Sequence, residues 1–181
     1  SEVETIKREI DKLMKELTEK IKRIKEEDDK VHEELKRAVD RSRERLEEVL
    51  KELRDRGVPD KKLRELEKLI EELKRRNDDL LRKLKEVNEK TREDLERLLR
   101  DLRRLLKELR ERLKELKDRN SDEKEIRDLM REIREVAERA KKRVDELLER
   151  IRRINTKLKE ELKELHKRTE DLIKKAKEEV N

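Results

Sequence analysis

The spacing of the apolar residues constrains the fold of this chain more than any other feature. Along almost all of the 181 residues, apolar side chains recur at alternating steps of three and four. That spacing places them on one side of an α-helix. The pattern forms three runs, Val3 to Leu53, Leu63 to Leu116 and Ile126 to Val180. A disordered chain of mixed charge has no reason to keep such a step, so the pattern predicts three long amphipathic helices.

Turn-forming residues interrupt the pattern at two places. At the first, Gly57 is suited to the left-handed conformation that ends a helix, and Pro59 fits the first turn of the next helix. At the second, Asn120 is the next-best left-handed residue, and Ser121 is a natural N-cap followed by Asp122. Both interruptions are short, which predicts antiparallel neighbouring helices.

These signals together give the expected fold. Ser1 and Glu4 form a capping-box pattern at the start of the chain, and the helices are expected at about 2–56, 59–118 and 122–180. The fold class is all-α: a single-chain, up-down-up antiparallel three-helix bundle, coiled-coil-like, built of very long and nearly straight helices. An apolar spacing of about 3.5–3.6 residues adds a slight left-handed supercoil.

The width of the apolar face predicts how many partners each helix has. Hydrophobic residues make up 30% of the chain, close to the roughly 29% of a narrow two-in-seven seam. Three helices around one axis can close on seams of that width, which favours a monomer with residues 1–181 as one bundle. A partner helix, a second copy or a membrane surface needs a further apolar stripe, and the sequence shows none.

Composition excludes several other classes. The chain has no Cys and no aromatic residue, one Gly, one Pro and 61% charged residues. It cannot form a disulfide framework or a thiolate metal site, and it lacks the turn residues of a sheet-rich fold. It has no apolar stretch long enough for a membrane span or a signal core. We therefore expect a soluble protein, without an indication of its compartment.

Polar residues interrupt the apolar seam in a pattern of their own. Ten of them lie on or beside it: Asp28, His32, Ser42, Asn77, Asn88, Thr91, Asn155, Thr156, His166 and Thr169. When the chain is folded at its two turns, most of these residues fall at two levels. One level holds Asp28, His32, Asn88, Asn155 and Thr156, and the other holds Ser42, Asn77 and His166.

Matched levels predict buried hydrogen-bond layers that draw on all three helices. An isolated buried polar group costs about 1–3 kcal/mol. A connected network recovers most of that cost and penalises any register that separates its members. The alternative is that some of these side chains simply point to solvent. The two histidines also allow a pH response, whose sign depends on whether His32 is buried neutral or pairs as a cation with Asp28.

No catalytic, cofactor or metal site is expected. Asp28, His32, Ser42 and His166 supply the residue types of a nucleophilic triad, but Ser42 lies about 15 Å along the helix from His32. No Gly-rich turn offers an oxyanion hole. The helix that carries His32 lacks the second His of a zinc-protease motif, and Lys163 breaks the Glu-x-x-His pattern before His166.

Specific nucleic-acid binding is not expected either. Arginines are frequent in residues 97–112, but acidic residues are interleaved with them. The chain has no aromatic side chain to stack on bases. This stretch is interpreted as a solvated helix face.

The chain as a whole resembles a known class of protein. Aromatic-free composition, faces rich in Lys, Glu and Arg, regular caps and short loops, and layers of Asn, Asp, His, Ser and Thr in a Leu/Ile seam are similar to de novo designed helical bundles with buried hydrogen-bond networks. That class is related to designed heterodimers, heterotrimers and switchable cages. Natural spectrin-type repeats are the nearest biological analogue, but they usually carry core aromatics.

The resemblance implies a function without natural chemistry. Such proteins have no natural substrate, so the expectation is a thermostable monomeric scaffold that is not an enzyme and requires no cofactor or partner. The alternative is an interaction or switch module that binds a partner helix, or self-associates, through its apolar seam.

Overall fold

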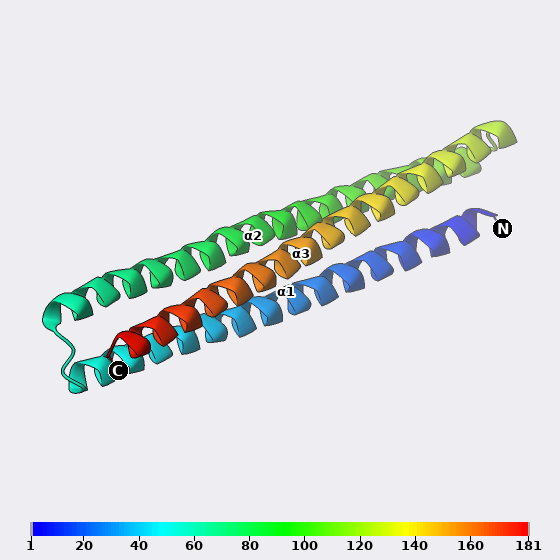
Figure 1. Ribbon diagram of the computed structural model, residues 1–181. Coiled ribbons are helices and arrows are strands. Elements are labelled where there is room, and N and C mark those ends of the chain that lie inside the picture. Colours follow the sequence, from blue (N-terminus) through cyan, green and yellow to red (C-terminus); the bar gives the residue numbers. More distant parts are fainter. Residues whose placement is uncertain (1, 181) are drawn as a thin grey trace. The chain divides into compact units, whose positions relative to one another are not determined.

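The computed structural model describes residues 2–180 and shows an all-α protein (Figure 1). Its helices are α1 (Glu2–Asp55), α2 (Asp60–Asp118) and α3 (Glu123–Val180), and no strand occurs within the described residues. The three predicted helices are confirmed, each within one residue of its expected ends. The capping box predicted at Ser1 falls outside the described residues. No helix contains a stretch apolar and long enough to cross a membrane, among the residues described.

The turn after α1 has the geometry predicted from Gly57. This residue has a φ of 79°, and its N–H donates to the Arg54 carbonyl at 3.1 Å while the Val58 N–H donates to the Leu53 carbonyl at 3.2 Å. These two bonds define a Schellman motif. The Pro59 carbonyl accepts from the Leu63 N–H at 3.1 Å, so Pro59 is the residue before α2 and not its first helical residue.

The turn after α2 repeats this motif with a different left-handed residue. Asn120 has a φ of 51°, and the Ser121 N–H donates to the Leu116 carbonyl at 3.0 Å. The prediction that Ser121 caps α3 is wrong by one residue. The Asp122 side chain accepts from the Lys124 N–H at 3.3 Å, and the carboxylate is the better acceptor at the positive end of a helix.

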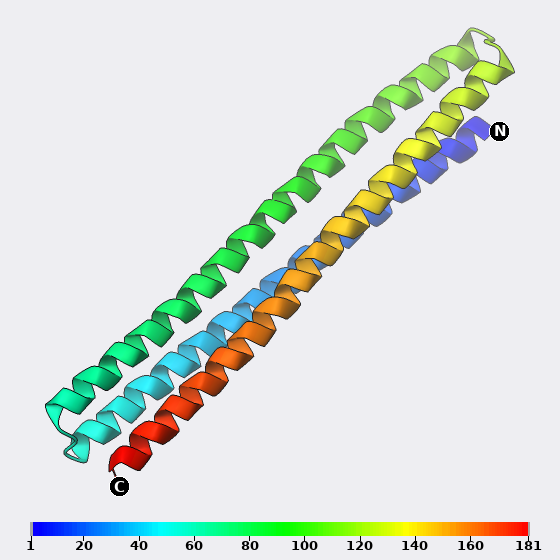
Figure 2. The ribbon, with the colours of Figure 1, turned by 45° about the horizontal axis from the view of Figure 1, so that its top comes forward.

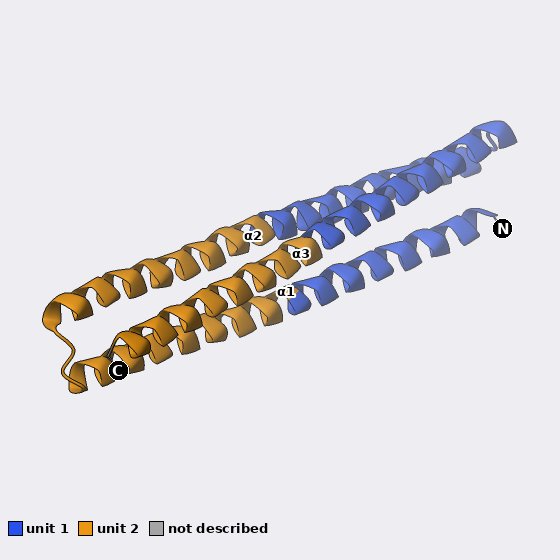
Figure 3. Cartoon of the chain, in the orientation of Figure 1, with its two compact units in different colours: residues 1–27, 89–151 blue, residues 28–88, 152–181 orange. Residues whose placement is uncertain are grey.

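The chain divides into two compact units, and every helix contributes to both (Figure 3). Unit 1 comprises residues 1–27 and 89–151, and unit 2 comprises residues 28–88 and 152–181. The Gly57 turn belongs to unit 2 and the Asn120 turn to unit 1, and both turns can be followed in Figure 2.

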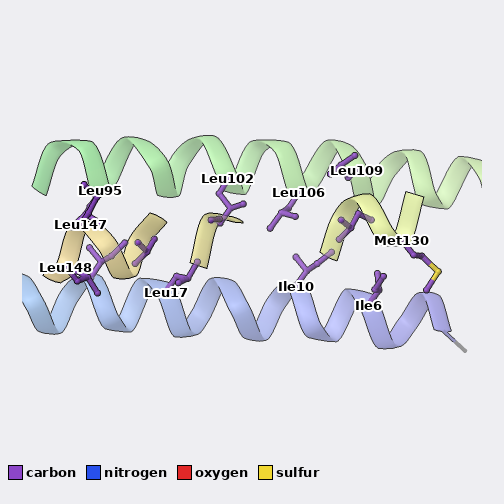
Figure 4. Packing of buried hydrophobic residues seen from close by; sticks show 14 of the residues in the cluster. Ile6, Ile10, Leu17, Leu95, Leu102, Leu106, Leu109, Met130, Leu147 and Leu148 are labelled. Atoms are coloured by element: carbon purple, nitrogen blue, oxygen red, sulfur yellow. The ribbon is translucent and has the colours of Figure 1, made fainter. Parts of the chain in front are cut away.

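Unit 1 has one apolar core that draws on all three helices. In Figure 4, Leu17 of α1, Leu102 and Leu106 of α2 and Leu147 of α3 lie in the space between the helices. Leu95, Leu113, Val144 and Ile151 are completely buried. Burial of such side chains, at about 25 cal/mol per Å² of apolar surface, is the main source of stability. This core follows the predicted seam.

Unit 2 has two smaller apolar cores. One lies beside the Gly57 turn and includes Leu46, Leu53 and Ile173. The other includes Leu35, Val39, Leu158 and Leu162, and its α2 members Leu80, Leu81 and Leu84 are only partly buried. Unit 2 also contains nearly all of the predicted polar residues.

Candidate functional site

Four buried polar residues of unit 2 form a hydrogen-bonded group, which we call the linked cluster. It consists of Asp28 and His32 from α1, Asn88 from α2 and Asn155 from α3. Between 0% and 8% of each of these residues is exposed. The first predicted level therefore exists in the core and takes at least one side chain from every helix.

Asp28 is the common acceptor of the linked cluster. Its Oδ1 accepts from Nδ2 of Asn88 at 2.9 Å and from Nδ2 of Asn155 at 2.9 Å. His32 Nε2 lies 3.1 Å from the same oxygen. Asn88 Nδ2 also donates to Asn155 Oδ1 at 2.7 Å, which closes a ring of three side chains.

The ring fixes the orientation of the Asn88 amide. Its two protons are used by Asp28 and Asn155. The opposite orientation would set the carbonyl oxygen of Asn88 against the oxygens of both neighbours. As oriented, Asn88 Oδ1 is buried and has no hydrogen-bond partner in the described structure. That one unsatisfied acceptor is the cost of the arrangement.

Counting hydrogen-bond donors and acceptors also shows which ring nitrogen of His32 carries a proton. The Asn88 amide has two protons, and both are donated to Asp28 and Asn155. It therefore has none left to donate to His32 Nε2, which lies 3.3 Å from Asn88 Nδ2. His32 Nε2 therefore carries the proton and donates to Asp28. A second proton on Nδ1 would be buried without an acceptor, since Nδ1 has no partner among the described residues.

Asp28 is ionised despite its burial. Desolvation on its own raises the pKa of this carboxyl group. The hydrogen bonds from His32, Asn155 and Asn88, together with the charge interaction with His32, outweigh it, and the pKa of Asp28 is lowered. An anionic oxygen that accepts several donors forms stronger hydrogen bonds than a neutral one.

Thr156 was predicted at this level, and Thr91 and Thr169 were predicted on the seam outside both levels. Thr156 is exposed, so its inclusion in a buried layer is wrong; it follows Asn155 by about 100° of helix rotation, which turns it outward. Thr169 is buried, but its hydroxyl donates to the Leu165 carbonyl of its own helix at 2.8 Å. Thr91 is buried in unit 1.

The second predicted level forms a different arrangement, which we call the cavity cluster. Ser42 of α1, Asn77 of α2 and His166 of α3 line one cavity of about 600 Å³ in unit 2. Asn77 is 6% exposed, Ser42 is half-buried and His166 is exposed. The prediction that these residues share one location is confirmed.

The cavity cluster is not a hydrogen-bond network, and that part of the prediction is wrong. Ser42 Oγ and Asn77 Oδ1 are buried without a hydrogen-bond partner in the part of the chain described. The physical reason is the lack of a strong common acceptor, since none of the three side chains is a carboxylate.

Sequence reasoning missed the remaining residues of this cavity. Ala38, Arg41, Lys159 and Lys163 also line it. The available signal was Ala38 followed one helical turn later by Ser42, which leaves little side-chain volume along one side of α1.

Neither cluster provides the geometry of a catalytic or metal centre. Ser42 Oγ makes no hydrogen bond to His166, so these two residues are not a nucleophile and base in contact. Among residues 2–180, no group of three or more His, Cys, Asp or Glu side chains could hold a metal ion.

Comparison with known proteins gives no relative: no family model matches the chain, and neither the curated proteins nor the solved structures contain a match to it.

Proposed function

We propose that this chain is a designed structural scaffold, an up-down-up antiparallel three-helix bundle in which the linked cluster specifies the register of the helices. One observation carries the proposal. Asp28, Asn88 and Asn155 come from three different helices and meet through hydrogen bonds of 2.7–2.9 Å. The scaffold has no chemistry of its own, and its purpose is to fold in one defined way.

Surface ion pairs support the antiparallel order. Between α1 and α2 in unit 2, the α2 number falls as the α1 number rises: Arg43–Asp78, Glu47–Lys74 and Arg54–Glu67. Between α1 and α3 both numbers rise together, as in Arg45–Glu170 and Glu52–Lys177. This order is expected of an up-down-up bundle.

The linked cluster supplies specificity that the apolar seam lacks. Slipping α2 by one heptad, about 10 Å of helix, would exchange leucine for leucine at many seam positions. The same slip would carry Asn88 away from Asp28 and Asn155 and leave the buried carboxylate without one of its donors. Leaving a buried polar group without its partner costs about 1–3 kcal/mol, and more for a charged group. The native register is therefore favoured over its nearest competitors.

A cross-linking experiment tests this role. The chain has no Cys, so an introduced pair reports on one register. Arg43→Cys with Asp78→Cys reports the native register, because these side chains form an ion pair at 2.7 Å. Arg43→Cys with Glu71→Cys reports α2 displaced by one heptad. A short bis-maleimide should join the first pair and not the second.

The decisive variant replaces the linked cluster by leucine: Asp28→Leu, His32→Leu, Asn88→Leu and Asn155→Leu together. Apolar replacement of a whole buried polar group is often neutral or stabilising, so this variant should stay helical. In this background we expect both Cys pairs to cross-link. If only the native pair reacts, the linked cluster does not set the register and the proposal fails.

A second candidate function is the interaction or switch module. The observation that favours it is a pair of exposed apolar side chains on α2 of unit 2, Leu69 at 45% and Val87 at 37% exposure. They lie about five helical turns apart and so on the same side of the helix. Light scattering separates the two candidates, since a scaffold has the 22.4 kDa mass of one chain and a self-associating module has a multiple of it.

A further inference from the structure

Helix α2 is buried less completely in unit 2 than in unit 1. Within residues 60–84, which we call the 60–84 segment, the buried side chains are those of Leu63, Ile70 and Asn77, and five leucines are half-buried. In the equally long stretch 92–116 of unit 1, five leucines are buried: Leu95, Leu102, Leu106, Leu109 and Leu113. Packing of an apolar face provides most of the stability of a helix in a protein. The 60–84 segment is therefore held less firmly.

The other two helices of unit 2 do not share this weakness. In the two apolar cores of that unit, α1 contributes five buried residues, α3 contributes four and α2 contributes two. The residues from α1 and α3 are Leu35, Val39, Leu46, Val49, Leu53, Leu158, Leu162, Ile173 and Ala176. When unit 2 opens locally, the 60–84 segment is thus the part that separates at the lowest free energy.

Asn77 lowers the stability of the 60–84 segment further. It lies well inside the segment and is 6% exposed, yet its Oδ1 has no hydrogen-bond partner in the described structure. Water supplies that hydrogen bond when the segment opens, so the unsatisfied acceptor favours the open state. Ser42 Oγ of α1, whose residue lines the same cavity, is also buried without a partner among residues 2–180 and is hydrated in the same way.

Ion pairs do not make up for the missing apolar burial. The pairs between α1 and the 60–84 segment include Arg43–Asp78, Glu47–Lys74 and Arg54–Glu67. At least one partner in each of these pairs is more than a third exposed. Solvent screens such pairs, and they add little stability.

The two ends of the 60–84 segment allow it to move as one piece. Before it, the Gly57 turn is a non-helical connection to α1. After it, Asn88 is completely buried and donates to Asp28 and Asn155 at 2.9 and 2.7 Å. Opening can therefore stop at the linked cluster, which keeps its hydrogen bonds.

We propose that the 60–84 segment opens from unit 2 and that the face of α1 and α3 beneath it binds a free amphipathic helix in its place. The segment that covers this face shows the chemistry of the partner: leucine or isoleucine at the buried and half-buried positions, and charged residues elsewhere. Leucine at the position of Asn77 improves the fit, because it brings no unsatisfied acceptor. The partner to use is therefore a peptide of residues 60–84 with Asn77→Leu. This property goes beyond the scaffold role, which concerns the closed state alone.

Hydrogen exchange of the full chain, read by mass spectrometry, tests the opening. After correction for intrinsic rates, we expect the amides of the 60–84 segment to exchange at least tenfold faster than those of residues 92–116. The reason is that fewer buried side chains must be exposed for the 60–84 segment to open. Equal protection of the two stretches would overturn the proposal.

Titration of the full chain with the labelled peptide, followed by fluorescence anisotropy, tests the binding. The peptide competes with a tethered segment whose effective concentration is about 1 mM. Its leucine gives it an advantage of about fivefold, the effect of one unsatisfied group, so half-saturation is expected at about 0.2 mM. The chain variant Asn77→Leu is the matched control: its own segment has the same advantage, and half-saturation should need about fivefold more peptide. A peptide of the same composition with its leucines out of helical register should not bind.

A locked chain shows where the peptide binds. In the variant with Arg43→Cys and Asp78→Cys, a short bis-maleimide joins α1 to the 60–84 segment and should abolish binding. The same variant with each Cys capped by N-ethylmaleimide should still bind the peptide. Binding that persists in the locked chain would place the peptide elsewhere, and no saturable binding to the unmodified chain up to about 1 mM peptide would mean that the face does not accept a free helix. Either result overturns the proposal and leaves the register test, which reads the closed state, unaffected.

Discussion

The linked cluster and the cavity cluster start from similar residues and reach opposite outcomes. Each contains an Asn from α2 and a His, which lies on α1 in the linked cluster and on α3 in the cavity cluster. The linked cluster also contains Asp28, whose one oxygen accepts from Asn88 and Asn155, whereas the cavity cluster has no carboxylate. A polar layer becomes a network when a strong acceptor lies within reach of several donors. Matched height along the bundle axis is not sufficient.

The largest expected effect removes that acceptor. Asp28→Leu leaves the donors of His32, Asn88 and Asn155 without their common partner, and we expect the free energy of unfolding to fall by about 3 kcal/mol. Urea denaturation followed by circular dichroism measures it. Asp40→Leu, at an exposed position of the same helix, is the control and should change stability by less than about 0.5 kcal/mol. Equal effects of the two substitutions would mean that the linked cluster contributes no more than the surface does.

The same substitution at two asparagines of α2 should change the free energy of unfolding in opposite directions. Asn77→Leu removes an acceptor that has no partner and should raise the free energy of unfolding by about 1 kcal/mol. Asn88→Leu removes two hydrogen bonds and should lower it. Thermal denaturation of the two variants side by side measures the difference. A loss of stability in both variants would mean that Asn77 makes a stabilising interaction in the folded protein, and would contradict this prediction.

A pH series sharpens the contrast at Asp28. Its pKa in the folded protein lies below the ordinary value of 3.8, so ionised Asp28 contributes stability above that value and loses it as the pH falls through the folded pKa. The advantage of the unmodified chain over Asp28→Asn should be constant from pH 7 to pH 5 and shrink below about pH 4. Urea melts at pH 7, 5 and 3 measure it; a constant advantage at all three would contradict the lowered pKa.

The smallest expected effect on stability is at an exposed ion pair, whose carboxylate has a lowered pKa as that of Asp28 does. Arg45 holds Glu170 through two bonds of 2.6 and 3.1 Å, which lowers the pKa of Glu170, but both side chains are more than a third exposed. Glu170→Gln should cost about 0.5 kcal/mol or less. The cost should vanish in about 1 M salt because exposed charges are screened. Melts at low and high salt measure it, and a cost that survives high salt would be inconsistent with a screened pair.

The sequence was sufficient to predict the helices and the levels of the polar residues. The three-and-four step and the residues Gly57 and Asn120 give helix ends to within one residue. Short turns then fix which residues face each other, which is why Asp28, Asn88 and Asn155 were predicted to meet. These are consequences of helix geometry and chain connectivity alone.

Hydrogen bonding within each level depends on details that the pattern does not contain. Asn155 and Thr156 are adjacent, and only the exact rotation of α3 places the first inside and the second outside. At the other level, Ser42 and Asn77 line the same cavity, yet Ser42 Oγ and Asn77 Oδ1 have no hydrogen-bond partner in the described structure. A one-dimensional pattern of polar and apolar residues does not record where individual side-chain atoms lie.

The conformation of Gly57 has a consequence for chemical synthesis of the chain. With a φ of 79°, this residue occupies a region that D-amino acids prefer. D-alanine should therefore fit the α1–α2 turn without backbone strain. It would restrict the unfolded chain more than glycine does and raise stability by about 0.4–1 kcal/mol, so this turn accepts a mirror-image building block where L-alanine would be strained.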